Sequence, residues 1–478
     1  MKNRYYLNHF PVFLFCFFSS LMLKAQFIDT IWEYKPAPGQ FINTSPWGTP
    51  SSAHSLAGGI DGSLSLGAWG GCVVFSFDQP ITDHPDHPFG IDFTLFGNPV
   101  QQWAEPGVVW VMKDENKNGL PDDTWYQLAG SDHFFSSTQR NVEVTYFNPD
   151  YENATHVRWL DHEGNQGYLD VHADHPHPYY PLQDSFPDVD AQQYLLTGTR
   201  LPNLTDTSDP PFMKFPGRAF GYADNSVKGS GTLTIPDNPY TPEIENAGGD
   251  GFDIAWAVDE NLEYVNLDTV HFIKVQTAVL ANAGWVGEIS TELRGGVRVE
   301  PNTSLSGELQ MVVIKDLPHL ITHPQWQLEA FAFHKGRVDF DKQILWEVDM
   351  PGASVDENMM LNLSESGELT IHAFLADNPE VSASVSVFVD IEGQTYIGET
   401  GKEALSVYPN PAQDHLVLSF PKSERARVNI YHPDGRLLKT LSGYSSGSQI
   451  YTGDLTPGVY LIRTLIKDRY MTVRFIKR

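Results

Sequence analysis

The chain is 478 residues long, and its 31 lysines and arginines against 60 aspartates and glutamates give a formal net charge of −29. This acidic balance excludes a general nucleic-acid binder, because polymer phosphates are bound through clustered basic side chains. The length corresponds to about two to four domains. The 39 glycines and 33 prolines, together with the lack of a long 3.6-residue periodicity, predict an all-β fold of short strands and turns.

Residues 1–25 have the three parts of a secretory signal peptide. Two basic residues near the start precede an apolar run from Val12 to Leu23, and Ala25 closes the segment. The run is 12 residues long, which is too short for a permanent membrane anchor. We expect cleavage near Ala25, the alternative being a buried N-terminal helix. No later segment has the roughly 18 consecutive apolar residues of a membrane helix, so no transmembrane span is predicted.

Residues 26–300 are predicted to form a jelly-roll-like β-sandwich of one or two units that binds the ligand. Short apolar or β-branched runs bounded by glycine, proline and aspartate indicate its strands. These runs are Cys72–Phe77, Gly107–Met112, Asn141–Phe147, Phe252–Val258 and His271–Leu280. After signal cleavage Cys72 is the single cysteine, which excludes an intramolecular disulfide.

Five short segments of this region combine glycine with aromatic or acidic residues. They are residues 36–41 (PAPGQF), 105–111 (EPGVVWV), 221–225 (GYADN), 251–259 (GFDIAWAVD) and 287–292 (GEISTE). Together they resemble a group of poorly characterised Bacteroidota cell-surface proteins, whose relatives are encoded near outer-membrane uptake systems, including those for vitamin B12. The resemblance implies capture of a ligand such as cobalamin and an outer-membrane uptake receptor as partner. It identifies no ligand-binding residues.

The clearest chemical motif is the loop at residues 114–123, DENKNGLPDD. Oxygen-bearing side chains stand at alternate positions, a glycine permits a sharp bend, and a backbone carbonyl completes the oxygen cage that Ca²⁺ requires. The predicted ligands are Asp114, Asn116, Asn118, Leu120, Asp122 and Asp123. Trp125 stands where the helix-loop-helix site has its bidentate glutamate, so we expect a structural Ca²⁺ between two strands. The alternative is an Asx-rich turn closed by hydrogen bonds without metal.

Two histidine clusters offer a weaker case for a transition-metal site. They are His84 with His87, and His172 with Asp174, His175 and His177. Zinc or copper needs ligands that converge on one point. Proline follows four of these histidines directly, which favours extended, solvated loops instead.

Signals for catalysis are sparse. The sequence has no metalloprotease motif, phosphate-binding glycine loop or dinucleotide fingerprint. Asp250, Asp253, Asp259 and Glu260 lie in one stretch, and a glycosidase needs only two carboxylates at the correct separation. Among 60 acidic residues, such a pair is more often part of a solvated face or a cation site.

The eleven tryptophans all lie between Trp32 and Trp346. In β-sandwiches most tryptophans belong to the core, but exposed indoles stack on sugar rings. Trp47, Trp69 and Trp103 stand near glycine and proline turns, so we expect these three at the surface.

Residues 305–392 alternate apolar and polar residues in several runs. The segments ILWEV at 344–348 and SGELTIHA at 366–373 resemble bacterial immunoglobulin-like domains, which implies a β-sandwich spacer. The glycine-containing, mostly polar residues 393–403 that follow predict an exposed linker.

The last segment, residues 404–478, differs in charge from the rest of the chain. It holds 11 basic and 5 acidic residues, whereas residues 26–403 hold 17 basic and 55 acidic residues. Alternating apolar residues separated by proline and glycine turns predict a small C-terminal β-sandwich.

Four motifs follow one another in this segment: VYPNPA at 407–412, VNIY at 428–431, DGR at 434–436 and LTPGVYL at 455–461. They resemble the type A C-terminal sorting domain of the type IX secretion system of Bacteroidota. The resemblance implies export through the periplasm, with residues 404–478 engaging the secretion machinery. The protein is then secreted or attached to the outer cell surface, usually after removal of the tail.

Together these features favour a non-enzymatic, calcium-stabilised binding protein that captures a glycan or another nutrient ligand such as cobalamin. Two alternatives remain open. One is a secreted glycoside hydrolase or peptidase, and the other is a structural adhesin or surface-layer component.

Overall fold

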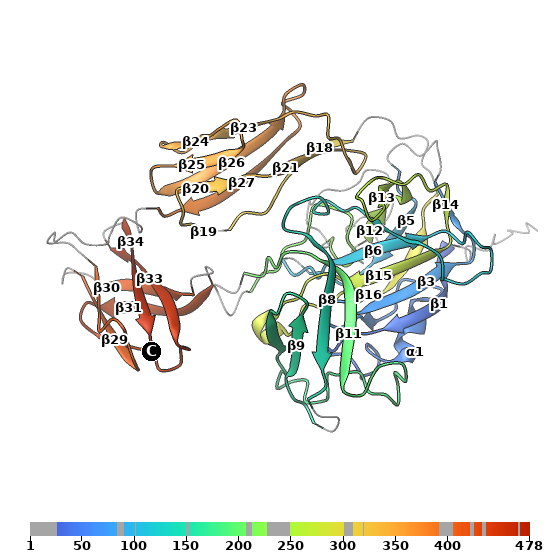
Figure 1. Cartoon of the computed structure of the whole chain (residues 1–478), viewed down its shortest axis with the longest axis horizontal. Helices are drawn as coiled ribbons and strands as arrows, with labels where there is room; N and C mark the ends of the chain where they lie inside the picture. The colour runs from blue at the N-terminus through green and yellow to red at the C-terminus, as the bar shows by residue number, and fades with distance from the viewer. Residues whose placement is uncertain are drawn as a thin grey trace, which may run out of the picture.

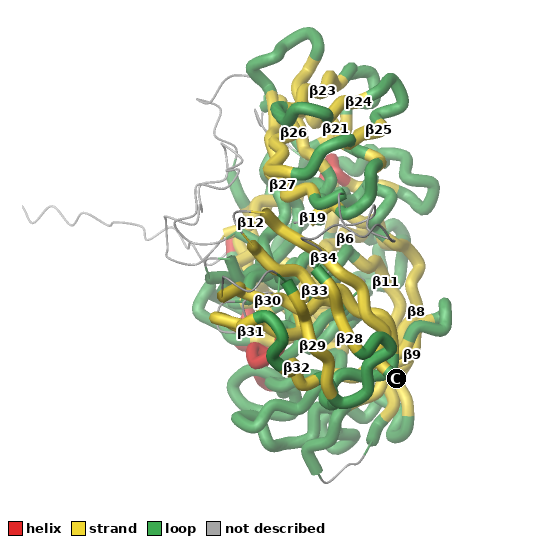
Figure 2. The backbone as a smooth tube through the Cα atoms, turned by 90° about the vertical axis from the view of Figure 1, so that its left-hand side faces the viewer, coloured by secondary structure: helices red, strands yellow, loops and turns green. Residues whose placement is uncertain are grey.

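In the computed structural model the regular secondary structure is almost entirely β-strand (Figure 1), which confirms the all-β prediction. It describes residues 26–83, 90–100, 102–149, 153–206, 213–226, 249–300, 309–318, 320–391, 405–420, 425–432, 436–466 and 469–478. The predicted signal peptide, the linker at 393–403, the pair His84 and His87, and the Asp434-Gly435 turn lie outside these residues. Helix is confined to a few short segments (Figure 2), and none of the described helices is long and apolar enough to cross a membrane.

The first part of the chain, whose described residues lie between 26 and 300, is organised around one broad antiparallel sheet of six strands. In spatial order these are β1 (Ile28–Lys35), β3 (Cys72–Phe77), β15 (Phe272–Thr277), β6 (Gly107–Met112), β7 (Trp125–Leu128) and β13 (Ala257–Val258). The predicted strands at 72–77 and 107–112 are confirmed with these bounds. Every residue of β3 is buried, because both faces of this strand are covered by other parts of the chain.

One face of the broad sheet, the core face, packs against a smaller antiparallel sheet. That sheet contains β12 (Gly249–Phe252), β5 (Phe93–Phe96) and β17 (Gly295–Arg298). Phe75 and Val275 from the broad sheet belong to the same core as Phe93 and Phe252, whose rings stack at 5.1 Å. Burial of these apolar side chains, about 25 cal/mol per Å², stabilises the two-layer arrangement.

The prediction of a continuous strand over Phe252–Val258 is wrong. The chain leaves β12 at Phe252 and forms the 3-10 helix η4 (Ile254–Trp256) before β13. The side chain of Asp253 accepts a hydrogen bond from the amide of Ala255 at 2.7 Å and so caps this helix. Aspartate competes with strand pairing in this way, because its short side chain satisfies nearby amides.

A four-stranded antiparallel sheet lies beside the opposite face of the broad sheet. Its strands are β10 (Gln166–Leu169), β9 (Val157–Asp161), β8 (Gln139–Phe147) and β11 (Gln193–Arg200). It has its own core, in which Val144, Tyr146 and Leu196 pack with the buried Trp69. The hydroxyl of Tyr146 donates to the carbonyl of Trp69 at 2.8 Å, so this sheet is fixed to the segment that leads into β3.

The second part of the chain, whose described residues lie between 309 and 391, contains three further sheets. The first of these sheets contains β18 (Gln310–Ile314), β21 (Ala330–His334) and β22 (Arg337–Val338). The second contains β19 (Leu320–Ile321), β27 (Ser382–Val389), β26 (Gly367–Leu375) and β23 (Ile344–Val348). The third contains β20 (Gln325–Gln327), β25 (Met360–Leu363) and β24 (Ala353–Val355). In β26 the alternate residues Leu369, Ile371 and Ala373 are buried, which is the alternation that the sequence shows.

Side chains from both parts share one core. Phe333 and Val338 belong to the cluster that fills the first sandwich, and the Phe333 ring meets that of Phe220 at 5.1 Å. Trp256 belongs to the same core. Gly336 has φ +76°, and a Cβ atom there would lie 2.4 Å from the Trp256 ring, so only glycine fits this close approach.

The C-terminal part is a small two-layer sandwich. Its strands are β28 (Ser406–Tyr408), β29 (His415–Ser419) and β32 (Gln449–Tyr451) in one sheet, and β31 (Leu437–Ser445), β30 (Arg425–Tyr431), β33 (Gly458–Ile466) and β34 (Arg469–Lys477) in the other. At the end of β27, Asp390 accepts a hydrogen bond from Thr472 at 2.9 Å and lies 3.6 Å from Arg463. These contacts join the C-terminal sandwich to the second part of the chain.

Because Phe333 completes a core that contains residues from both parts, its truncation should destabilise both. Phe333→Ala is expected to cost about 3–5 kcal/mol of unfolding free energy. Hydrogen exchange should show lower protection in the broad sheet as well as in β21. The matched control is Phe340→Ala, since Phe340 is 65% exposed, and it should cost less than about 1 kcal/mol. Unchanged protection of the broad sheet in Phe333→Ala would contradict the shared core.

Candidate functional site

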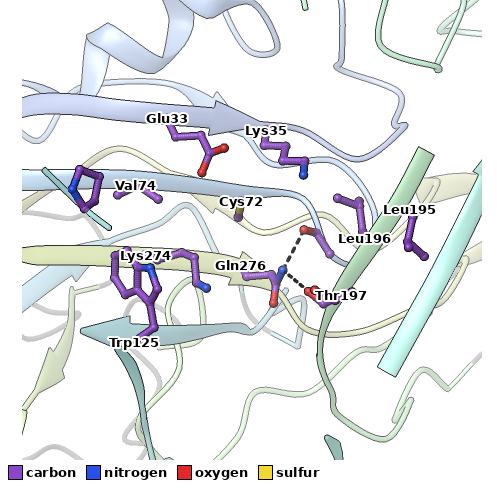
Figure 3. A pocket seen from close by; sticks show the side chains of 12 residues that line it. Glu33, Lys35, Cys72, Val74, Trp125, Leu195, Leu196, Thr197, Lys274 and Gln276 are labelled. Carbon is purple, nitrogen blue, oxygen red and sulfur yellow. Dashed lines mark hydrogen bonds between the residues drawn. The ribbon is translucent and has the colours of Figure 1, made fainter. Parts of the chain in front are cut away.

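A pocket of about 220 Å³ lies between the broad sheet and the edge strand of the four-stranded sheet (Figure 3). We call it the sheet-face pocket. It is lined by Glu33, Lys35, Gly70, Cys72, Val74, Pro121, Trp125, Leu195, Leu196, Thr197, Lys274 and Gln276. These residues come from β1, β3, β15 and β11 and from the end of the predicted calcium loop with the start of β7. Segments more than 200 residues apart in the sequence therefore form one site.

Strand register places the polar side chains of the pocket in two neighbouring rows. Glu33 pairs with Val74 across β1 and β3, and Val74 pairs with Lys274 across β3 and β15. In the next row, Lys35 pairs with Cys72, which pairs with Gln276. Side chains of paired residues point to the same face of a sheet, so both rows face away from the core of the first sandwich.

Lys274 is held by two indole rings. Its ammonium group lies 4.6 Å from the centre of the Trp110 ring and 5.0 Å from that of Trp125. Cation–π contacts of this kind stabilise by about 0.5–2 kcal/mol each. Burial lowers the pKa of Lys274 from its ordinary value, and the nearby Cys72 and Glu33 partly oppose this shift.

Gln276 of β15 links the broad sheet, which forms the floor of the pocket, to β11, which forms one of its walls. Its side-chain amide donates to the carbonyls of Gly70 and Thr197, each at 2.9 Å (Figure 3). Next to Thr197, a Cβ atom at Gly198 would lie 2.1 Å from the Gln276 oxygen. Glycine at 198 therefore lets β11 approach the broad sheet closely enough to form the pocket.

Cys72 is a free, buried thiol at the floor of the pocket. Burial raises its pKa to about 11, and the neighbouring Lys274 offsets only part of this effect. The group is therefore a neutral thiol at physiological pH. Because thiolates are the nucleophilic and metal-binding form of cysteine, Cys72 contributes packing rather than reactivity.

The predicted calcium loop adjoins this pocket through Pro121 and Trp125. Within the loop, the two carboxylate oxygens of Asp114 accept hydrogen bonds from the amides of Asn118 at 3.1 Å and Gly119 at 2.9 Å. Gly119 has φ +74°, a conformation that favours glycine. The loop thus turns around the Asp114 carboxylate.

The remaining predicted ligands gather on the same side of the loop. The side-chain amides of Asn116 and Asn118 both donate to Asp122, each at 3.1 Å, and Asp123 accepts from the amide of Glu115 at 2.9 Å. The backbone carbonyl of Leu120 accepts from the amide of Asp122 at 3.0 Å. The structure therefore brings all six predicted residues into one turn. A hydrogen-bonded turn and a Ca²⁺ cage would both use these oxygen atoms.

A second group of carboxylates is found away from the loop. Asp83, Asp92 and Asp253 each offer an oxygen atom within 4.8 Å of the others. The amide of Ile254 donates to Asp92 at 2.9 Å. Burial and then the neighbouring Asp253 raise the pKa of Asp92. Three oxygen donors at such separations suit a hard cation. The sequence singled out only Asp253, because the other two lie more than 160 residues away.

The four carboxylates considered for hydrolysis do not converge on one point. Asp250 accepts the amides of Asn225 at 3.0 Å and Ser226 at 2.9 Å, while Asp253 caps a 3-10 helix. Asp259 accepts the amide of Asn261 at 2.8 Å in a separate turn. Glu260 is exposed. Asp253 therefore meets Asp83 and Asp92, and the other three carboxylates lie in separate local structures.

The histidine cluster at 172–177 forms a series of ring contacts. The centres of His172 and His175 are 6.4 Å apart, and those of His175 and His177 are 6.2 Å apart. Burial and then His175 lower the pKa of His177. His172 lies 3.4 Å from an Asp174 oxygen, but among the described residues none of these histidines belongs to a group of three or more metal-ligating side chains whose donor atoms all lie within 4.8 Å.

The prediction of surface tryptophans is wrong for Trp69. This side chain is fully buried, and its indole nitrogen donates to the carbonyl of Thr199 at 3.0 Å. Trp103 is partly buried and stacks on Phe215. Two indoles at the pocket, Trp110 and Trp125, were not singled out from the sequence. The signal for Trp110 is the alternation of β6, in which Val109 and Val111 point to the core and Trp110 does not.

A separate set of acidic residues is buried inside the first part of the chain. Asp224 accepts the amides of Asn98 at 2.9 Å and Glu292 at 2.8 Å, and Glu105 accepts that of Ser290 at 3.0 Å. Burial raises the pKa of Glu292 to about 7. For Asp224, burial and then Glu292 raise the pKa.

Glu288 belongs to the same buried set. One of its oxygens accepts the amide of Gln40 at 2.7 Å, and the other has no hydrogen-bond partner among the described residues. Burial raises its pKa to about 8.

Residues 406–478 match the family model of the secretion system C-terminal sorting domain. The chain is exported by the type IX secretion system. This match confirms the prediction for the tail and places the protein at the cell surface or in the medium.

Solved structures to which the chain is similar include PorZ, a surface component of the type IX secretion system of Porphyromonas gingivalis, at 17% identity over 26% of this chain and 16% of that chain, with a TM-score of 0.14. Dimeric latent PorU from the same organism matches at 10% identity over 70% of this chain and 29% of that one, with a TM-score of 0.12. Three N-terminal domains of the Hoc capsid protein of bacteriophage RB49 match at 8% identity over 45% and 84% of the two chains, with a TM-score of 0.17.

These TM-scores do not establish a common fold. The chain spans about a sixth of PorZ and less than a third of PorU. No curated protein sequence matches it.

If the loop at 114–123 binds Ca²⁺, the ion should stabilise the fold. At a Ca²⁺ concentration of 100 times Kd, the expected gain is about 2.7 kcal/mol, seen as a higher Tm than in chelator. Asp114→Asn keeps a hydrogen-bond acceptor and removes a charge, so it should abolish most of the gain. Asp268→Asn, at an exposed aspartate outside the loop, is the matched control. Equal Tm values with Ca²⁺ and with chelator would identify a metal-free turn.

The buried Glu288 should make stability depend on pH. An acid whose pKa rises on folding stabilises the fold while it is protonated. Its contribution is complete below the unfolded value of 4.5 and is lost as the pH rises to about 8. We expect Tm to fall between about pH 5 and pH 8. Glu288→Gln should reduce this fall, whereas Glu357→Gln, at an exposed site, should not. Identical pH profiles for wild type and Glu288→Gln would show that the carboxylate stays ionised.

Proposed function

We propose that the protein is a non-enzymatic binding protein of the outer cell surface that captures a glycan in the sheet-face pocket. The observation that carries the proposal is that Trp125 lines a polar pocket together with Lys274, whose ammonium group lies over the rings of Trp125 and, behind it, Trp110. Indole faces stack on the C–H face of a sugar ring, and charged or amide groups beside them bind its hydroxyls.

The size of the pocket favours a sugar over cobalamin. Pockets for drug-sized ligands are about 300–1,000 Å³, and this pocket has about 220 Å³. A volume of this order accommodates one sugar unit of a longer chain. A corrinoid is much larger and would need a site of different dimensions.

In this proposal, Ca²⁺ in the loop at 114–123 is structural. The loop connects β6 to β7, and its residue Pro121 lines the pocket together with Trp125. A bound ion would hold this wall in place without contacting the sugar.

The other parts of the chain serve export and display. The sorting domain directs the chain across the outer membrane, and residues 305–392, which we interpret as an immunoglobulin-like spacer, would hold the binding region away from the cell. An uptake receptor in the outer membrane would receive the captured glycan.

Trp125→Ala should reduce glycan affinity at least tenfold, because the mutation removes a stacking surface of the pocket. The measurement is titration calorimetry with oligosaccharides that are first identified on a glycan array with the wild-type chain. Tyr168→Ala is the matched control, since Tyr168 is 56% exposed and does not line the pocket. It should bind as wild type does.

Two outcomes would contradict this function. Failure of the wild-type chain to bind any glycan on the array would remove its basis. Turnover of a labelled polysaccharide or peptide would instead establish the hydrolase alternative.

A further inference from the structure

The charges in the sheet-face pocket indicate which class of sugar it takes. We propose that the pocket selects an anionic sugar unit, carboxylated or sulfated, through the ammonium group of Lys274. This inference rests on the proposed function and makes its ligand more specific.

Lys274 differs from other lysines of the chain in its partners. Lys113, Lys315 and Lys342 lie 2.5, 2.9 and 2.6 Å from the carboxylates of aspartate or glutamate. Among the described residues, neither Lys274 nor Lys35 makes an ion pair, although the chain is rich in acidic residues. Their ammonium groups lie over aromatic rings instead, with Lys35 5.6 Å from the centre of the Tyr194 ring.

This arrangement leaves the positive charge of Lys274 available to a ligand. Lys274 is half-buried, and this burial lowers the pKa of its ammonium group. Burial removes part of the water that stabilises the positive charge of Lys274. An anionic group of a ligand in the pocket would replace this stabilisation by direct electrostatic attraction. Charge-assisted hydrogen bonds formed in such a site are roughly twice as strong as neutral ones.

The pocket also contrasts with the surface around it. Residues 26–403 carry 17 basic and 55 acidic residues, so the surface of this part repels anions that come within a Debye length, about 8 Å at physiological salt. Within the pocket, Lys35 and Lys274 face one carboxylate, Glu33. This local excess of one positive charge suits a sugar with one negative charge. A group with several negative charges would be repelled by Glu33 and by the surrounding surface.

Glu33 and Trp125 give the site its preference for a sugar over a simple anion. The Glu33 carboxylate accepts hydrogen bonds from hydroxyl groups, and Trp125 offers a ring next to Lys274. A sugar unit presents hydroxyls, a C–H face and one acidic substituent within a few ångströms of each other. Its groups therefore match the three kinds of side chain in the pocket.

The test compares acidic and neutral oligosaccharides by titration calorimetry with the full chain. The probes are a galactan oligosaccharide with a single galacturonate unit for the carboxylate, one with a single sulfate group for the sulfate, and the neutral galactan oligosaccharide of the same length. Wild type should bind one or both acidic probes at least ten times more tightly than the neutral one. Which acidic probe binds identifies the source of the negative charge.

The variant Lys274→Met keeps the apolar stem and removes the charge, so it should lose at least tenfold in affinity for the acidic probe only. Glu33→Gln should tighten binding of that probe two- to fivefold. Lys342→Met, which breaks an ion pair away from the pocket, is the matched control and should bind as wild type does. The Tm of each variant shows whether it is folded, and the wild-type preference needs no variant at all.

Equal or tighter binding of the neutral probe by wild type would overturn the inference, and so would unchanged acidic binding by Lys274→Met. If neutral binding depends on Trp125, the proposed glycan function stands without the anionic preference. If the wild-type chain binds none of the probes and no glycan on the array, both the anionic preference and the proposed glycan-binding function are refuted.

Discussion

The antiparallel register of β1, β3, β15 and β6 is the constraint on which the rest of the structure depends. It divides the side chains of these strands between two faces. Val73, Phe75 and Val275 enter the core of the first sandwich, while Cys72, Lys274 and Gln276 face the opposite side. A shift of one residue in any pairing would exchange the two sets. The same hydrogen bonds therefore fix the stability of the fold and the composition of the pocket.

The local pattern of the sequence predicts most of the strands. Runs such as Cys72–Phe77 and Gly107–Met112 are short, apolar and bounded by turns, and a strand is the structure in which such runs bury both faces. The pattern fails at Phe252–Val258, because the single residue Asp253 offers its neighbours a hydrogen bond that a strand does not. It also fails at Trp69, whose glycine-rich surroundings resemble an exposed turn but are covered by the four-stranded sheet. Both failures depend on contacts that a local window does not contain.

The candidate site is harder than the strands to predict from local patterns in the sequence. The six predicted Ca²⁺ ligands can be named from the sequence because they lie within ten consecutive residues, 114–123, and their spacing is itself the signal. The pocket brings Glu33, Trp125, Thr197 and Lys274 together from four strands, and none of these residues is distinctive alone. The proximity of Glu33, Lys274 and Trp125 follows from the strand order β1-β3-β15-β6-β7, in which β15 lies between strands that are distant from it in sequence, and Thr197 is brought to them by β11 of the four-stranded sheet. That order cannot be read from alternation, which identifies strands and not their partners.

The loop at 114–123 and the pocket are joined by the chain itself as well as by proximity. The loop lies between β6, which carries Trp110, and β7, which begins at Trp125. Both indoles contact the same ammonium group of Lys274. At the base of the loop, Met112 of β6 pairs with Trp125 of β7, and Trp110 pairs with Gln127. The distance between the two indoles, and with it the environment of Lys274, is therefore set by this strand pairing. The loop at 114–123 closes the strand pair, so the hydrogen bonds within the loop oppose fraying of the pairing at Trp125.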